Sequence, residues 1–530
     1  MNKEADSLPS IFNDVMGPVM RGPSSSHTAG SWRIARTTVQ MLNEELTEAL
    51  VEFDRKGVWA SNYREQGTTM GMDGGLLGID ITDERIINPD IVASAKGISI
   101  KYEISSFETD HAITVRLTLT GKSGKKMQII AVSTGGGMFE IRKYNGHPIR
   151  IRGDRHCLLI HASGNLEENE LSTLIGSSCG SAIASHSVAN AGSLYHVQSS
   201  EPLPRELIER MHSLKGVREI ISVDPVLPIL SGNETEFPFT DIASLLEYGK
   251  SKKYSLGRLG LIYERCRSGL DEKDLTAKMR ELIKIIENGI DVGLKGTDYR
   301  DRILHQQSDL VQKAVKTGRI KTDPLVNGII ANVSALMESK SAMQVIVAVP
   351  TAGSCGTFGG TVKAFCDVHD ISEEDKIKAY FAGGLIGVYF AKGPGFAAEE
   401  HGCQVETGAS ATMAAAALVE LSGGTAEQAV GAASLALQNT IGLVCDPVGD
   451  RVEVPCLGKN IAAGMNALAS SSMSIAGYDQ VIPLDQVIAT VKRVGRSMHS
   501  SLCNTGRGGL AVTPKAKELK VMLSKLGNGL

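Results

Sequence analysis

Residues 402–439, GCQVETGASATMAAAALVELSGGTAEQAVGAASLALQN, decide the fold of the second half of the chain. Two alanine-rich segments, 409–421 and 426–439, have the composition of mostly buried helices. Gly423-Gly424 supplies the turn between them, and Thr425 and Gln428 have the spacing of a capping box. Two helices of similar length joined by a short turn form a hairpin, so the chain before the first helix and after the second returns to one place.

Three cysteines lie around this hairpin. Cys403 precedes the first helix, Cys445 follows the second in GLVCDPVGD, and Cys456 comes after the turn signal Asp446-Pro447 in VEVPC. The hairpin therefore predicts that the three thiols converge. Three thiolates without a fourth suit a metal or cluster with one open position, because structural zinc normally takes four protein ligands. The alternative is that all three are small buried residues of a tight helical core.

Composition excludes several functional classes. The chain has 530 residues, a formal net charge of −4, 42% hydrophobic and 22% charged residues. So small a net charge gives no reason to expect nucleic acid or an anionic membrane as a partner. No apolar run reaches the roughly 18–20 residues of a membrane span, and the polar start MNKEADSLPS lacks a signal-peptide segment. We therefore expect a cytoplasmic protein in which the nine cysteines form no disulfides.

The first part of the chain, residues 1–150, predicts an α+β domain. Residues 31–50 have apolar residues at helical spacing. Strand patterns follow in 98–107, 111–121 and 126–136.

The middle of the chain, residues 151–226, predicts a strand, helix, strand, strand, helix, strand order. That order is the one of a ferredoxin-like (ACT-like) βαββαβ domain, and ACT domains bind amino acids. A structural or dimerising module is the alternative, since a fold alone does not assign a function. Residues 227–242, rich in Pro, Gly, Asn and Thr, predict a linker, and residues 243–530 predict a mostly α-helical domain.

A polar loop near the start, RGPSSSHTAG at residues 21–30, is too polar and broken for a core helix or strand. Its hydroxyl and imidazole groups, with backbone N–H groups turned inward, suit a small carboxylate. The alternative is a turn on the surface.

Together, GPVMRGPSSSHTAG, STGGG, VPTAGSCG, the three cysteine segments and GRGGLAVTP resemble the iron–sulfur-dependent L-serine dehydratases. The resemblance covers nearly the whole length, as if the β and α parts of that family were fused in one chain. It implies a [4Fe-4S] cluster held by Cys403, Cys445 and Cys456 with one iron free, and it makes Cys355, Cys366 and Cys503 packed thiols. It also implies a homodimer.

The activity that the resemblance implies is dehydration of a small β-hydroxy acid by a hydro-lyase. The open iron acts as a Lewis acid for the leaving hydroxyl, and L-serine gives pyruvate and ammonia. The implied catalytic residues are Ser26, His27, His111 and Asn460. The implied substrate-binding residues are Ser24, Ser25, Thr28, Thr351, Ser354 and Arg507.

Several of these roles stay open in the sequence. His27 suits substrate binding or proton transfer, because an imidazole titrates near neutral pH. Asn460 suits a buried capping role equally well, and His111 a structural role. Arg507 is either a fork for a carboxylate or an ordinary surface arginine.

The sequence departs from the family pattern at candidate substrate contacts. Where relatives usually have a GHGTD-like segment, this chain has Glu65-Gln66-Gly67-Thr68-Thr69, and a glutamine cannot replace a histidine as a base. The segment LKGTDYR, 294–300, adds Lys295 and Arg300, cations that suit a second carboxylate. The second candidate is therefore a 2-(hydroxymethyl)glutarate dehydratase or a related hydroxymethyl-acid dehydratase.

Two other classes compete with this interpretation. A pyridoxal-phosphate dehydratase would use the glycine-rich GSCGTFGG, 353–360, for the phosphate and Lys363 for the Schiff base, but it leaves the three cysteines unexplained. A non-catalytic amino-acid sensor would use the ACT-like segment and predicts ligand binding without iron or turnover.

Overall fold

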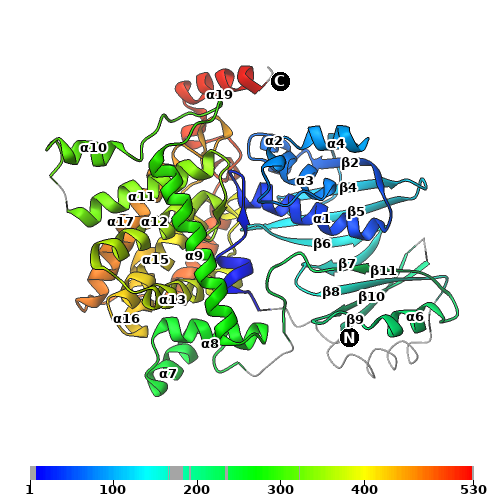
Figure 1. Cartoon of the computed structure of the whole chain (residues 1–530), viewed down its shortest axis with the longest axis horizontal. Helices are drawn as coiled ribbons and strands as arrows, with labels where there is room; N and C mark the ends of the chain where they lie inside the picture. Colours follow the sequence, from blue (N-terminus) through cyan, green and yellow to red (C-terminus); the bar gives the residue numbers. More distant parts are fainter. Residues whose placement is uncertain are drawn as a thin grey trace.

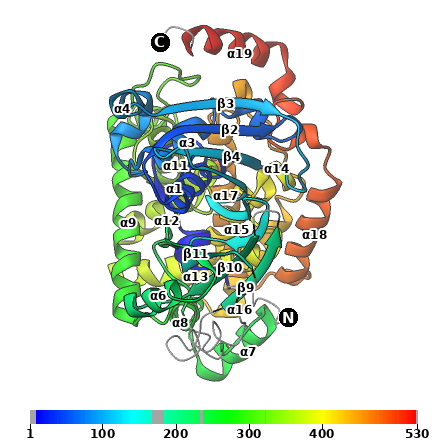
Figure 2. The same cartoon turned by 90° about the vertical axis from the view of Figure 1, so that its right-hand side faces the viewer.

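The computed structural model describes residues 8–164, 166, 183–189, 192–232, 237–321 and 323–527. It has a helical half and a half built on two β-sheets, which lie side by side in Figure 1. The second view shows the sheets stacked one above the other in front of the helices (Figure 2). Within the described residues, no helix is long and apolar enough to cross a membrane.

The helical hairpin forms as predicted. Helices α15 (Thr407–Leu421) and α16 (Ala426–Gln438) pack together. Thr425 and Gln428 form the capping box, with Thr425 N donating to Gln428 Oε1 at 2.9 Å and Gln428 N donating to Thr425 Oγ1 at 3.2 Å. The alanine-rich faces are buried against α13 (Glu373–Lys392) and α17 (Cys456–Ile475).

The rest of the second half is mostly helical, as predicted. Its other helices are α7 (Ile242–Lys252), α8 (Leu256–Ser268), α9 (Glu272–Lys295), α10 (Leu310–Lys316), α11 (Pro324–Ser341), α12 (Cys355–His369), α14 (Ala398–His401), α18 (Leu484–Ser497) and α19 (Pro514–Gly527).

The first sheet has six strands in the order β3-β2-β4-β5-β6-β7. Their bounds are β2 (Leu46–Asp54), β3 (Ser99–Ser105), β4 (Thr114–Gly121), β5 (Lys126–Gly135), β6 (Met138–Tyr144) and β7 (His147–Ile151). β2 and β3 are parallel and the other neighbours antiparallel. The helices of this half are α1 (Gly30–Leu42), α2 (Trp59–Asn62), α3 (Thr68–Leu77) and α4 (Pro89–Lys96). The α+β character of the first part is therefore confirmed.

The helix predicted over 31–50 is wrong in its second half. α1 ends at Leu42, where Asn43 adopts a left-handed conformation with φ 57°. The chain then enters β2 at Leu46. As a strand, this segment buries the side chains of Ala49, Val51 and Phe53 on the same face of the sheet. Its sequence is compatible with a helix or a strand, and pairing with β3 and β4 determined that it is a strand.

The second sheet has four antiparallel strands in the order β11-β8-β10-β9. They are β8 (His156–Ala162), β9 (Ile183–Ala189), β10 (Gly192–Ser199) and β11 (Val217–Val223), and α6 (Arg205–His212) packs on them. The four strands and the second helix predicted for 151–226 are present. The first helix predicted there, 169–178, lies outside the described residues.

The N-terminal segment joins the two halves. Residues Ile11–Val15 form a π-helical turn whose side chains pack on α13, where Ile11 meets Gly384 and Val15 meets Gly387. β1 (Val19–Met20) then pairs with β12 (Ile346–Val347) of the helical half. Asn13 also forms two hydrogen bonds, at 2.6 and 3.1 Å, with the backbone of Ile229 in the predicted linker. The polar loop at 21–30 therefore starts from the boundary between the halves.

Candidate active site

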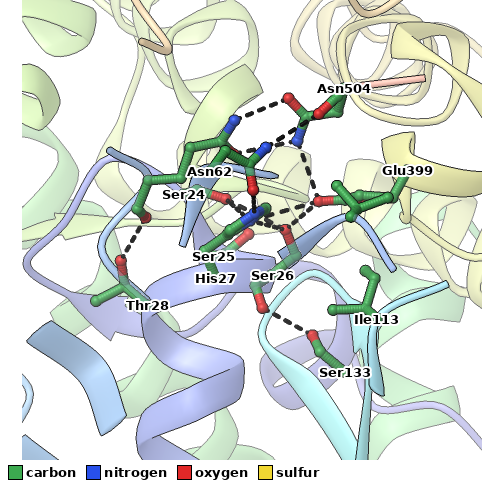
Figure 3. Close-up of polar contacts among 12 residues, drawn as sticks. Ser24, Ser25, Ser26, His27, Thr28, Asn62, Ile113, Ser133, Glu399 and Asn504 are labelled. Carbon is green, nitrogen blue, oxygen red and sulfur yellow. Dashed lines mark hydrogen bonds and ion pairs between the residues drawn. The ribbon is translucent and has the colours of Figure 1, made fainter. Parts of the chain in front are cut away.

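The serine-rich loop is buried, so the surface-turn alternative is wrong. Ser25–Ala29 form a π-helical turn that leads into α1, and His27 has 0% exposure. The loop is fixed from both sides. Ser133 Oγ of β5 donates to the Ser26 carbonyl oxygen at 2.8 Å (Figure 3). On the other side, Ala352 N of the helical half donates to Ser25 Oγ at 3.3 Å.

The His27 ring is held on both nitrogens. Nε2 lies 3.0 Å from Asn62 Oδ1, and Asn62 Nδ2 donates to the Asn504 carbonyl oxygen at 3.0 Å. The Asn62 oxygen therefore faces the ring and accepts from Nε2–H, which assigns the tautomer from the hydrogen-bond pattern. Nδ1 lies 3.1 Å from the hydroxyls of Ser24 and Ser26. Burial lowers the pKa of His27 against the opposing effect of Glu399, which favours a neutral ring with its lone pair at Nδ1.

A buried carboxylate, Glu399 of α14, organises the hydroxyls next to this ring. Its Oε1 accepts from Ser26 Oγ at 2.7 Å and from Asn504 Nδ2 at 3.2 Å, and it lies 3.5 Å from His27 Nδ1. Asn504 also exchanges two side-chain hydrogen bonds with Gln66, at 2.9 and 3.1 Å. Figure 3 shows these side chains pointing toward one another from segments far apart in the sequence.

Three members of this network were missed by the sequence analysis: Asn62, Glu399 and Asn504. Gln66, recognised only as a departure from the family pattern, also belongs to it. The pair Glu399-Glu400, separated from Cys403 by two residues, was the available signal for Glu399. An isolated asparagine has no comparable signal.

Other predicted residues have structural contacts. Thr351 and Ser354 form a capping box over a short 3-10 turn, and Thr28 Oγ1 donates to the Gln66 carbonyl oxygen at 3.2 Å. Asn460 takes the capping role: its side chain accepts from Thr357 N at 2.9 Å and donates to the carbonyl oxygens of Gly353 and Cys456.

His111 and Arg507 lie outside the His27 network. His111 Nε2 pairs with Glu400 Oε1 at 3.3 Å. Arg507 is exposed, and within the described residues it forms no hydrogen bond or ion pair with His27, Ser26 or Glu399. Lys295 and Arg300, the cations expected near the pocket, are also exposed.

The structure brings two of the three cysteines together with a carboxylate. The ligand atoms of Cys403, Cys445 and Glu406 lie within 4.8 Å of one another. The hydrogen bond from Cys445 lowers the pKa of Cys403 to about 7 against the effect of burial, and the same bond and burial raise the pKa of Cys445 well above its usual value. Cys403 is therefore close to the thiolate form that binds metals.

Cys456, the third thiol, begins α17 and is buried. Burial, and then the negative charge of Cys403, raise its pKa to about 12, while Lys340 opposes this. Glu406 is half-buried, and desolvation, followed by the negative charges of Cys403 and Glu399, raises its pKa well above the usual range. Without a bound cation, most of these acidic groups are therefore held protonated.

Lys340 of α11 is a fully buried cation beside this group. It has 0% exposure, and its ammonium donates to the Val452 carbonyl oxygen between the second and third cysteines. Burial lowers the pKa of Lys340, and Cys456 and Cys355 are the largest influences that raise it. A buried ammonium without a close carboxylate is costly unless anions form around it.

Lys340→Met is expected to have opposite effects on the apoprotein and on metal binding. The apoprotein is expected to become more stable, because a buried ammonium that forms no ion pair with a described carboxylate is replaced by an apolar side chain. Iron retention falls, because the cation that balances the thiolates is gone. Thermal unfolding of chelator-treated protein and iron per chain measure the two effects. Lys376→Met, which breaks a partly exposed ion pair with Glu287, is the control. Full iron retention in Lys340→Met would contradict the role of Lys340 in balancing the charge of the thiolates.

The donor set fits an iron–sulfur cluster. Its thiols are buried, one is poised as a thiolate, and cations adjoin it: besides Lys340, Lys459 Nζ donates to the Val444 carbonyl oxygen and to Asp446 Oδ1, each at 2.7 Å. Thiolates in a buried setting are the ligands that such clusters use. Cys355 is a buried thiol whose pKa burial raises to about 12.

The residues of the pyridoxal-phosphate alternative do not form a phosphate site. Residues 355–360 are the first turns of α12, where Gly356 and Gly360 allow close packing against Val333 and Met337 of α11. Lys363 forms an ion pair with Asp367 on the same helix at 2.8 Å. Both features are those of a packed helix rather than of a cofactor cradle.

The site combines thiol and carboxylate donors that could hold a metal with a buried histidine–carboxylate network next to them. This arrangement is typical of an enzyme active site. The chain belongs to the serine dehydratase alpha chain family, whose model matches residues 163–511. It is therefore a lyase.

Similarity to individual relatives extends over nearly the whole chain. The L-serine dehydratase of Streptomyces coelicolor is 25% identical over 500 residues, 93% of this chain and 96% of the relative. The probable L-serine dehydratase alpha chain of Bacillus subtilis is 33% identical over 282 residues, 53% of this chain and 94% of the relative. The probable beta chain of the same organism is 38% identical over 151 residues, 28% of this chain and 67% of the relative. Relatives of both types thus align with one chain, as the resemblance implied.

Proposed function

We propose that this chain is an iron–sulfur-dependent dehydratase that converts L-serine to pyruvate and ammonia. The observation that carries the proposal is the group of two buried thiols, Cys403 and Cys445, and the half-buried Glu406, whose ligand atoms lie within 4.8 Å of one another. The names of the relatives, L-serine dehydratases of one or two chains, support the substrate. Cys456 completes the ligand set of the proposed [4Fe-4S] cluster. When bound, the cluster supplies a Lewis acid that helps the β-hydroxyl to leave.

The chain's own residues supply substrate binding and proton transfer. Ser24 and Ser25, with backbone N–H groups of their turn, hold the substrate carboxylate, and Thr28 fixes that turn through its hydrogen bond to Gln66. His27 accepts the α-proton at Nδ1, the nitrogen left with a lone pair by the bond from Nε2–H to Asn62. Elimination gives aminoacrylate, which tautomerises and hydrolyses to pyruvate and ammonia.

Glu399 acts through its neighbours in this scheme. It fixes the Ser26 hydroxyl by accepting a hydrogen bond from it, and its negative charge favours the charged form of His27 during proton transfer. The full burial of His27 keeps water away from the ring, which strengthens both interactions. The network thus orients the base rather than adding a second one.

We further propose the domain organisation 1–150, 151–226 and 243–530, with a linker at 227–242. The strand order β11-β8-β10-β9, with α6 packed on the sheet, supports a ferredoxin-like, ACT-like middle domain. A homodimer and a cytoplasmic location belong to the same proposal.

A second substrate, 2-(hydroxymethyl)glutarate, is favoured by one observation. A cavity next to Glu399 is lined by several arginine and lysine side chains, which suit a second carboxylate.

One experiment tests the cofactor and both substrates. Protein purified without oxygen is analysed for iron and sulfide, and turnover of L-serine and of 2-(hydroxymethyl)glutarate is measured side by side. Iron, sulfide and pyruvate from L-serine support the proposal. Turnover of the dicarboxylate alone replaces L-serine as the substrate. Ligand binding without iron or turnover makes the chain an amino-acid sensor.

A further inference from the structure

A cavity of about 930 Å³ lies between the two halves of the molecule. On the sheet side it is lined by residues of β5, β6 and β7, among them Arg150 of β7. Arg152, which follows β7, lines it as well. On the helical side it is lined by the segment from the end of α13 to α14 and by Lys492 and Arg496 of α18. This volume is within the range of about 300–1,000 Å³ of ligand pockets and far exceeds what one serine fills.

The cavity adjoins the His27 network. Glu399, which holds Ser26 and Asn504, is itself one of its lining residues. His111 and Glu400, which pair with each other, line it as well. A molecule in the cavity therefore has the catalytic network as its neighbour.

The acidic side chains that line the cavity form ion pairs or accept hydrogen bonds from neighbouring residues. Glu140 accepts from Arg150 at 2.9 Å, and Asp14 pairs with Arg152 at 3.8 Å. Glu400 pairs with His111, and Glu399 accepts two hydrogen bonds from the network.

Several cations of the cavity have no carboxylate partner. Among the described residues, none forms an ion pair with Lys392, Lys492 or Arg496. Lys492 Nζ donates to the Gly393 carbonyl oxygen at 2.9 Å. Lys492 and Arg496 are one helical turn apart and so lie on one face of α18.

We propose that this cavity is a second carboxylate site, in which Lys492 and Arg496 bind an anion beside the His27 network. A guanidinium and an ammonium on one helix face match the two oxygens of a carboxylate. The carboxylate comes either from the far end of a dicarboxylic substrate or from a separate carboxylic acid that acts as an effector. The first source deepens the proposed function and rests on it, whereas the second does not.

Succinate is the probe, because it carries two carboxylates and no hydroxyl to eliminate. Calorimetry on the holoenzyme without oxygen measures its affinity for wild type, Lys492→Ala/Arg496→Ala and Arg493→Ala. Arg493 is the matched control, an exposed arginine of the same helix that does not line the cavity. We expect the double variant to bind succinate about tenfold more weakly or worse, and the control to bind like wild type.

A single variant protects the test against a folding defect. Arg496 is exposed, so Arg496→Ala is expected to keep the fold and still weaken succinate binding. Wild type without measurable succinate binding, or equal binding by all variants, overturns the proposal.

Kinetics distinguish the two sources of the carboxylate. Competition by succinate against the substrate places the substrate's own far carboxylate in the cavity. A change in kcat without competition identifies a separate effector. Because succinate binding is measured without turnover, failure of the proposed function and failure of the cavity proposal can be distinguished. Succinate binding that depends on Lys492 and Arg496 supports the cavity proposal even if neither substrate is converted. Turnover of L-serine with unchanged binding in the variants defeats the cavity proposal alone.

Discussion

Cys445→Ser is expected to abolish iron binding and activity together. Cys445 is buried, lies within 4.8 Å of the ligand atoms of Cys403 and Glu406, and donates the hydrogen bond that keeps Cys403 near its thiolate form. The substitution removes one proposed thiolate ligand, and a serine hydroxyl is not a soft ligand of the kind that iron–sulfur clusters use. Iron and sulfide per chain, together with turnover of L-serine, are expected to fall to background levels.

Cys366→Ser is the matched control. Cys366 is a buried thiol of α12 that lies outside the Cys403–Cys445–Glu406 group. This variant is expected to keep its iron and its activity, with at most a modest loss of stability. Unchanged iron content in Cys445→Ser contradicts the ligand assignment.

His27→Gln is expected to lower kcat by about 10²–10⁴-fold, the usual contribution of a positioned acid or base. The glutamine can still hydrogen-bond to Asn62, but it has no lone pair that accepts a proton near neutral pH. Iron content is expected to stay unchanged, because His27 lies outside the thiol group. Steady-state kinetics on protein matched for iron measure the effect.

His156→Gln controls for the loss of an imidazole as such. His156 lies on β8 and pairs with Asp224 at 3.4 Å, outside the network. A raised KM with unchanged kcat in His27→Gln means that His27 binds the substrate and transfers no proton. Unchanged kcat and KM contradict both roles.

The parts of the fold predicted from sequence are those that local chemistry decides. The capping box of Thr425 and Gln428 and the turn at Gly423-Gly424 are short-range signals, and the hairpin followed from them. The segment 31–50 shows the limit. A helical period continued past Asn43, but pairing with strands 50 or more residues away determined the conformation.

The site was predicted less completely, because burial and partner choice are properties of the tertiary structure. The loop of Ser24–Thr28 has the composition of a surface turn, yet it is enclosed between the two halves. Asn504 meets Gln66 from 438 positions away. Lys340 is of a residue type that is almost never fully buried, so no sequence rule would have placed it beside the thiols.

The central claim is that three thiolates of this chain hold one inorganic cluster. A crystal structure of protein purified and crystallised without oxygen tests it most directly. The account predicts the sulfur atoms of Cys403, Cys445 and Cys456 each bonded to iron, at about 2.3 Å, with one iron of the cluster bound by no protein atom. A metal held by Glu406 and two cysteines, with Cys456 unbonded, would contradict it.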